Sequence, residues 1–260
     1  MKFKYILLLL GLILFTAPVH AKMVTRSIDY QYEGTKLQGF MAYDDAITGS
    51  RPGVLVVHEW WGLNDYVRDR VKQLAGMGYV AFALDMYGKN QVTEHPQQAA
   101  EWSKAVTANI KTWRGRALAG LAVLRAEKRA DSKRIAAIGY CFGGSTVQQL
   151  AYTGADLNGV VSFHGSLILP PADTGSVRAK ILIAHGAADP LTKPEQLESY
   201  LKAMNATGLD WQMIIFGGAK HAFTNPKADS FGIAALGYSQ RADRRSWQYM
   251  KLFLNEIFTH

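Results

Sequence analysis

The rhythm of hydrophobic and polar positions changes near residue 50 and predicts two kinds of strand. Residues 24–44 alternate loosely between apolar and polar side chains around Glu33-Gly34, which is typical of an antiparallel hairpin at a sheet edge. Later, short continuous apolar runs predict strands buried on both faces. These runs lie at 53–57, 80–84, 134–138, 159–163, 181–184 and 211–216.

Stretches with helical periodicity separate these strands. They cover 65–77, 96–128 (as one or two helices), 143–152, 194–204 and 241–257. Strands that alternate with helices predict an α/β fold with a doubly wound, mostly parallel sheet. The least regular stretches are 87–96, 167–177 and 224–237. Each follows a strand, where open α/β sheets place their binding crevice.

The first 21 residues have the features of a secretory signal. Lys2 and Lys4 precede an apolar run over 5–16, and Val19-His20-Ala21 gives a small-residue cleavage pattern before Lys22. An uncleaved anchor is the alternative, but the run is shorter than the roughly 18 apolar residues of a membrane span. We therefore expect residues 1–21 to be a signal peptide and the mature protein to be periplasmic or secreted, with no membrane anchor.

Composition favours one domain over residues 22–260. The chain has 260 residues, 48% of them hydrophobic, and no low-complexity tract or linker divides it. The formal charge of +8 falls by two with the signal peptide, and the remaining basic residues are scattered among acids, which argues against nucleic-acid binding. No strand is followed by a dinucleotide-binding or phosphate-binding glycine motif, so no cofactor is expected.

A candidate nucleophile lies between a predicted strand and a predicted helix. Gly139-Tyr-Cys141-Phe-Gly143 matches the nucleophile-elbow pattern G-x-S-x-G with cysteine in place of serine. At a helix N-terminus the dipole favours a thiolate. A buried, inert cysteine is the alternative. However, Cys141 is the chain's one cysteine, so no internal disulfide explains it.

A base and an acid follow the nucleophile in the required order. Asp189 lies in a loop directly after the strand 181–184, and His221 lies in a loop after the last strand, flanked by small residues. Either residue alone could be a turn or a capping residue. Together with Cys141 they predict a catalytic triad.

A further loop, 58–64, follows the first buried strand. An acyl-transfer site needs two N–H donors for the developing oxyanion, and the backbone amides of Trp60 and Phe142 are the natural candidates. Glu59 would then lie near the thiol, although it could equally be a surface residue. His58-Glu59 is not a zinc motif, because no second histidine stands at the H-E-x-x-H position, and no metal is expected.

The chain resembles the dienelactone hydrolase family over nearly all of residues 22–260. The resemblance rests on H-E-W-W-G at 58–62, L-D-M-Y-G at 84–88, G-Y-C-F-G-G at 139–144, F-H-G at 163–165, the loop ending in Asp189, and H-A-F at 221–223. It implies an α/β-hydrolase fold. It also implies Cys141 as nucleophile, His221 as base and Asp189 as its orienting acid. Finally, it implies that Glu59 contacts the resting thiol and that Trp60 and Phe142 supply the oxyanion amides.

The expected substrate pocket departs from this family in two places. Where founding members use arginines to bind the substrate carboxylate, this sequence has Lys89 and Asn225. Lysine cannot offer a bidentate fork, and asparagine carries no charge. The residues expected to line the pocket are Trp61, Tyr87, Lys89, His164, Phe223 and Asn225.

Two functions of different classes follow from these features. The first is an exported cysteine hydrolase that cleaves a small-molecule ester, lactone or thioester. The second is a non-catalytic ligand-binding or thiol-redox protein on a hydrolase scaffold, in which the thiol cycles through sulfenic acid. A complete triad favours the first.

Overall fold

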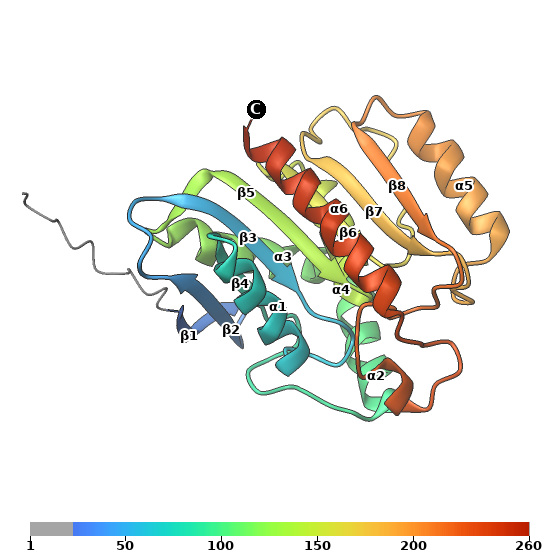
Figure 1. Cartoon of the computed structure of the whole chain (residues 1–260), viewed down its shortest axis with the longest axis horizontal. Helices are drawn as coiled ribbons and strands as arrows, with labels where there is room; N and C mark the ends of the chain where they lie inside the picture. The colour runs from blue at the N-terminus through green and yellow to red at the C-terminus, as the bar shows by residue number, and fades with distance from the viewer. Residues whose placement is uncertain (1–22, 260) are drawn as a thin grey trace, which may run out of the picture.

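One continuous eight-stranded sheet organises residues 23–259, the part of the chain that the computed structural model describes (Figure 1). The order of strands across the sheet is β1-β2-β4-β3-β5-β6-β7-β8. Their bounds are β1 Met23–Tyr32, β2 Thr35–Asp44, β3 Arg51–Val57, β4 Val80–Leu84, β5 Ala130–Tyr140, β6 Gly159–Phe163, β7 Lys180–Gly186 and β8 Trp211–Phe216. The expected signal peptide at 1–21 lies outside the described residues.

The predicted hairpin is formed by β1 and β2, and β1 is an edge strand. Its turn consists of Glu33 (φ 44°) and Gly34 (φ 78°). Two consecutive positive φ angles give the turn a twist that matches the twist of the two strands. Strand β2 pairs antiparallel with β4 and so joins the hairpin to the main sheet.

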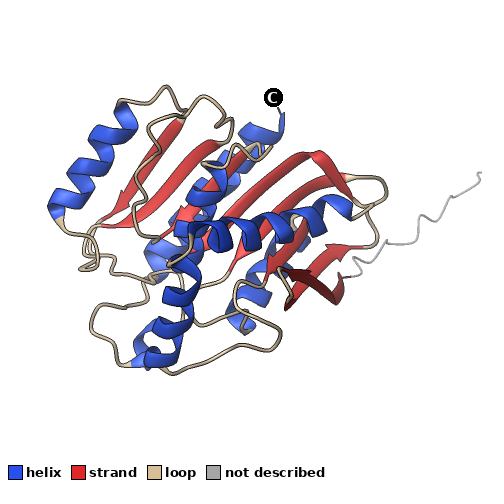
Figure 2. Cartoon of the chain, turned by 180° about the vertical axis from the view of Figure 1, so that it is seen from behind, coloured by secondary structure: helices blue, strands red, loops and turns tan. Residues whose placement is uncertain are grey.

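Helices cover both faces of the sheet. The two opposite views show helices on both sides of the sheet (Figures 1 and 2). Apolar residues of α1 and α6 belong to the core on one face, and those of α2, α3, α4 and α5 belong to the core on the other. The helices are α1 Asp65–Gly76, α2 Pro96–Thr107, α3 Ile110–Ala126, α4 Phe142–Ala151, α5 Pro194–Asn205 and α6 Gln240–Thr259. This two-layered covering leaves the central strands buried on both sides.

The prediction of an α/β-hydrolase fold with a doubly wound, mostly parallel sheet is confirmed. Residues 96–128 form two helices. Asn109 separates them, because its backbone is extended and its side chain caps α3 by accepting hydrogen bonds from the first turn. A short 3₁₀ helix, Ala228–Phe231, lies inside the stretch predicted to be irregular at 224–237. None of the helices in the described part of the chain is long and apolar enough to cross a membrane.

Every neighbouring pair of strands from β4 to β8 is parallel. Their carboxyl ends therefore meet at one edge of the sheet, where α/β folds bind ligands. The loops that leave β3, β5, β6, β7 and β8 carry His58, Cys141, His164, Asp189 and His221. Topology alone thus gathers residues that are up to 163 positions apart in the printed sequence.

Candidate active site

Cys141 sits in a strained turn between β5 and α4. Its backbone has φ 54° and ψ −117°, a left-handed conformation that non-glycine residues rarely adopt. The turn is tight: a Cβ added at Gly139 would lie 2.0 Å from the carbonyl oxygen of Gly143, and one at Gly143 would lie 2.2 Å from that of Val57. Both glycines are therefore required by space, as the elbow pattern predicts.

Two hydrogen bonds hold the backbone of this elbow. The amide of Cys141 donates to the carbonyl oxygen of Phe163 at 3.0 Å and to Nδ1 of His164 at 3.1 Å. Because Nδ1 accepts, the imidazole proton of His164 resides on Nε2, which donates to Oγ1 of Thr224 at 2.6 Å. His164 is fully buried, and this burial lowers its pKa well below the usual value, which keeps the ring neutral.

His221 and Asp189 form the second part of the site. His221 Nδ1 lies 2.8 Å from Asp189 Oδ2, and Asp189 Oδ1 accepts a hydrogen bond from the amide of Leu191. Burial lowers the pKa of His221, but the charges of Cys141 and Asp189 and their hydrogen-bonding interactions with the ring outweigh it and raise that pKa to about 10. The other ring nitrogen, Nε2, is buried and has no hydrogen-bond partner among the described side chains. It is the nitrogen available to exchange a proton.

The loop after β3 is held by the segment that follows the neighbouring strand β4. His58 is buried; its Nε2 accepts from the amide of Met86, and its Nδ1 therefore donates to the carbonyl oxygen of Glu59. The hydroxyl of Tyr87 donates to the carbonyl oxygen of Trp60 at 3.1 Å. These bonds occupy the carbonyls of residues 59 and 60 and orient the peptide units of the loop.

The two residues expected to supply the oxyanion amides both lie close to Cys141. Trp60 lines the same pocket as Cys141. Phe142 is the first residue of α4, so its amide has no partner inside the helix. Such unpaired amides are the groups that an oxyanion needs.

Glu59 is a buried carboxyl group in this pocket, with 1% of its surface exposed. The side-chain amide of Asn225 donates to Glu59 Oε2 at 2.6 Å. Burial raises the pKa of Glu59 to about 7, against the lowering effects of Asn225 and of the cations His221 and Arg70. The alternative of a surface residue is therefore wrong for Glu59.

A pocket of about 200 Å³ opens beside the thiol. Cys141, His221 and Glu59 supply its polar groups, and the remaining walls are apolar. These walls are Trp60, Trp61, Leu191, Ala222, Ile233, Ala235 and Leu236. The described residues contain no cluster of three or more histidine, cysteine or carboxylate side chains able to hold a metal ion.

Most of the residues expected in the substrate pocket lie elsewhere. Trp61 does line it, but Lys89 forms an ion pair with Asp29 on the hairpin, 2.8 Å apart. Tyr87 points into the loop at Trp60, as described above. His164 and Phe223 are fully buried behind the elbow, with ring centroids 5.1 Å apart. Tyr87, His164 and Phe223 all come after strands, but their side chains are buried in the protein and do not line the pocket.

Asn225, the remaining expected pocket residue, bonds Glu59 from outside this cavity and lines a separate polar pocket. The pocket walls that sequence reasoning missed come from the loop at 191 and from the segment 233–236. The available signal was the irregular stretch 224–237 after the last strand. Thr224 and Arg70 were also missed: Arg70 donates to the carbonyl oxygen of Thr224 at 2.8 Å and pairs with Asp243 on α6.

The fold and the arrangement of these side chains define an α/β hydrolase. The family model described as "Dienelactone hydrolase family" matches residues 37–258, and the chain therefore belongs to the dienelactone hydrolase family. It is accordingly a hydrolase that acts on ester or lactone bonds of small molecules.

Individual relatives cover nearly the whole chain. The crystal structure of P91, a dienelactone hydrolase-like promiscuous phosphotriesterase from metagenomic libraries, is 38% identical, with a TM-score of 0.88 over 91% of this chain and 99% of that one. A protein of Saccharolobus solfataricus, provisionally named a carboxymethylenebutenolidase, is 25% identical over 89% of this chain and 98% of its own. Dienelactone hydrolase from Anabaena variabilis shares the fold at 17% identity and a TM-score of 0.62, covering 88% of this chain and 98% of that one.

The ionisation of Glu59 gives a prediction about stability. Because folding raises the pKa of Glu59 from 4.5 to about 7, the stability it contributes is complete below pH 4.5 and is lost as the pH rises through 7. Glu59→Gln has no such titration, and its amide oxygen can still accept from Asn225. The free energy of unfolding of the parent protein, measured against that of Glu59→Gln by urea denaturation, should fall by roughly 3 kcal/mol between pH 4.5 and pH 8. A difference that does not change with pH would contradict this assignment.

Proposed function

We propose that this chain is an exported cysteine hydrolase that cleaves an ester, lactone or thioester bond through Cys141, His221 and Asp189. One observation carries the proposal: a cysteine at a strained strand-to-helix turn shares a pocket with a histidine that a buried aspartate holds at 2.8 Å. A nucleophile, a base and an orienting acid are the parts that covalent acyl transfer requires.

In the first half of the proposed reaction, the sulfur of Cys141 attacks the substrate carbonyl while His221 carries the thiol proton on Nε2. The carbonyl oxygen becomes an oxyanion that accepts hydrogen bonds from the amides of Trp60 and Phe142. The tetrahedral intermediate then collapses to a thioester on Cys141. His221 donates its proton to the departing alcohol or thiol.

In the second half, water attacks the thioester and His221 takes a proton from it. The thiolate leaves, the acid product departs, and His221 remains protonated beside the thiolate, as at the start. Asp189 accepts a hydrogen bond from the Nδ1–H group throughout, which fixes the tautomer of His221 and stabilises its positive charge.

Phosphotriester cleavage is a second candidate activity. P91, 38% identical over nearly all of this chain, is described as a promiscuous phosphotriesterase. A neutral phosphotriester suits the apolar walls of the pocket, and the same two amides could bind a phosphoryl oxygen. Release of 4-nitrophenolate from diethyl 4-nitrophenyl phosphate, measured on the parent protein and on Cys141→Ala, tests this activity directly.

Substitution of the thiol tests the proposed reaction. Cys141→Ala removes the nucleophile and should lower kcat on short aryl esters by at least about 10⁴-fold. Cys141→Ser should retain weak esterase activity, since a hydroxyl can also attack. The measurement is release of the phenol, with and without prior iodoacetamide, at matched thermal stability. Full activity of Cys141→Ala, or activity that survives alkylation, would contradict the proposal.

Assays on esters, thioesters and lactones also distinguish the proposed hydrolase from the alternative of a thiol-redox or ligand-binding protein. A redox protein would consume peroxide with an external thiol as reductant and leave every ester, thioester and lactone intact. The chain lacks a second cysteine that could resolve a sulfenic acid. Peroxide consumption without hydrolysis would therefore replace the first proposal by this one.

Export rests on residues 1–21, with residues 22–260 as the mature single domain. Expression of the full chain in a Gram-negative host should yield a periplasmic or secreted protein whose first residue is Lys22, as read by intact mass. Ala21→Arg places a bulky charge at the cleavage position and should block processing. A cytoplasmic product that keeps residues 1–21 would refute export without affecting the proposed chemistry.

A further inference from the structure

We propose that the substrate of this site is uncharged and apolar around the scissile bond, and that the pocket discriminates against carboxylate-bearing substrates. This inference rests on the proposed hydrolase function and names its substrate class.

The chemistry of the pocket walls is the first observation. Seven of its ten lining residues are apolar, and the polar ones are the nucleophile, the base and Glu59. Glu59 offers either a neutral carboxyl or a negative charge, and never a positive one. A carboxylate that entered would lose water without gaining an unpaired cation, because the positive charge of His221 is already engaged by Asp189 and by the Cys141 thiol.

Three lysine and arginine side chains around this region are engaged elsewhere. Lys89 pairs with Asp29 on the hairpin. Arg70 is buried behind the site and pairs with Asp243 on α6. The ammonium of Lys220 donates to the carbonyl oxygen of Ala234 on the outer side of the segment that closes the pocket, and Lys220 does not line the pocket. Among the residues that the structure describes, no lysine or arginine lines the cavity at the thiol.

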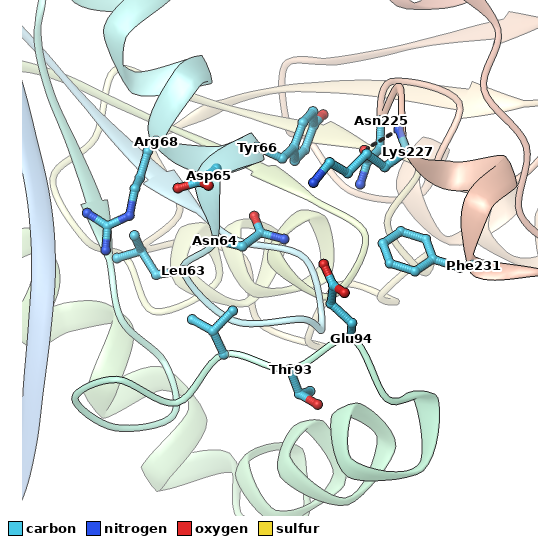
Figure 3. A pocket seen from close by; sticks show the side chains of 11 residues that line it. Leu63, Asn64, Asp65, Tyr66, Arg68, Thr93, Glu94, Asn225, Lys227 and Phe231 are labelled. Atoms are coloured by element: carbon cyan, nitrogen blue, oxygen red, sulfur yellow. Dashed lines mark hydrogen bonds between the residues drawn. The ribbon is translucent and has the colours of Figure 1, made fainter.

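A second, polar pocket of about 280 Å³ does contain cations, and it is the one place nearby that could take a carboxylate. Lys227 and Arg68 line it together with Asp65 and Glu94, so its charges are mixed (Figure 3). It neighbours the cavity at the thiol, but two contacts form the wall between them. These are the stacked rings of Trp61 and Phe231, with centroids 4.2 Å apart, and the hydrogen bond from Asn225 to Glu59. The cations of the polar pocket therefore do not face Cys141.

The size and the aromatic walls of the apolar cavity restrict the expected substrates further. Its volume of about 200 Å³ is below the roughly 300 Å³ at which pockets for drug-sized ligands begin. Trp60 and Trp61 meet edge to face at 4.8 Å and give it aromatic walls. Small aryl esters and small lactones are the compounds that fill such a space.

An isosteric pair of lactones tests the inference: 3,4-dihydrocoumarin-6-carboxamide and 3,4-dihydrocoumarin-6-carboxylate. They have nearly the same shape and differ by one charge. After correction for their rates with hydroxide, kcat/KM should be at least about 100-fold higher for the amide. Equal values, or faster cleavage of the carboxylate, would overturn the inference while leaving a thiol hydrolase in place.

Two variants locate the cause of the discrimination. Ile233→Arg introduces a guanidinium into the apolar wall and should raise the carboxylate-to-amide ratio of kcat/KM by at least about tenfold, while the matched neutral variant Ile233→Gln should not. Lys227→Ala should leave the ratio unchanged, because Lys227 belongs to the other pocket. A carboxylate preference that Lys227→Ala removes would instead assign substrate recognition to the polar pocket.

Failure of the proposed function has a different signature. If neither lactone is turned over and the aryl esters and thioesters also stay intact, the hydrolase proposal fails, and binding of the two lactones to Cys141→Ala, measured by calorimetry, decides the inference alone. Tighter binding of the amide supports an uncharged ligand. Equal or tighter binding of the carboxylate refutes it.

Discussion

The backbone of Cys141 has a left-handed conformation, with φ 54°, in the tight turn that joins β5 to α4. Gly139 and Gly143 make that turn possible, and the ring of His164 together with the carbonyl of Phe163 ties down the amide of Cys141. Left-handed angles recur at His164 and at Ala222, next to His221. Strain of this kind, which costs about 1–3 kcal/mol per residue, persists only where the surrounding structure holds it. Here it projects a sulfur and an imidazole into one small cavity.

Two ionisable groups of the cavity, His221 and Glu59, have protonation states that their surroundings set. Asp189 and the thiol favour a protonated His221, whereas burial favours a neutral Glu59. Asn225 keeps a hydrogen bond to Glu59 in either protonation state, since its amide can donate to a carboxylate or to the carbonyl oxygen of a carboxylic acid. The apolar walls strengthen each of these interactions, because they exclude the water that would screen them. The same dry walls make an additional, unpaired anion costly.

The sequence was sufficient to predict the fold and to predict that Cys141, His221 and Asp189 lie together. Glycine spacing located Cys141, and strand ends located Asp189 and His221, because parallel strands bring their carboxyl ends together whatever the details of packing. The pocket was predicted less well. Lys89 and His164 also follow strand ends, but the direction of their side chains depends on partners far away in sequence, Asp29 and Thr224.

Walls such as Leu191 and Ile233 come from loops whose path is set by tertiary contacts, and no local pattern encodes that path. The one useful sign was the irregularity of 224–237 itself. The catalytic roles of the residues are predictions made from the geometry of the site. Each of these roles assumes that the thiol of Cys141 is the nucleophile.

Trapping the covalent intermediate tests this account most directly. The mature protein would be mixed with a 4-nitrophenyl ester, quenched in acid within milliseconds, and analysed by intact mass and peptide mapping. The account predicts a burst of 4-nitrophenolate matched by an acyl group on Cys141, and the absence of that adduct in Cys141→Ala. Steady turnover with no adduct on Cys141 under any quench time, or with the acyl group on another residue, would contradict it.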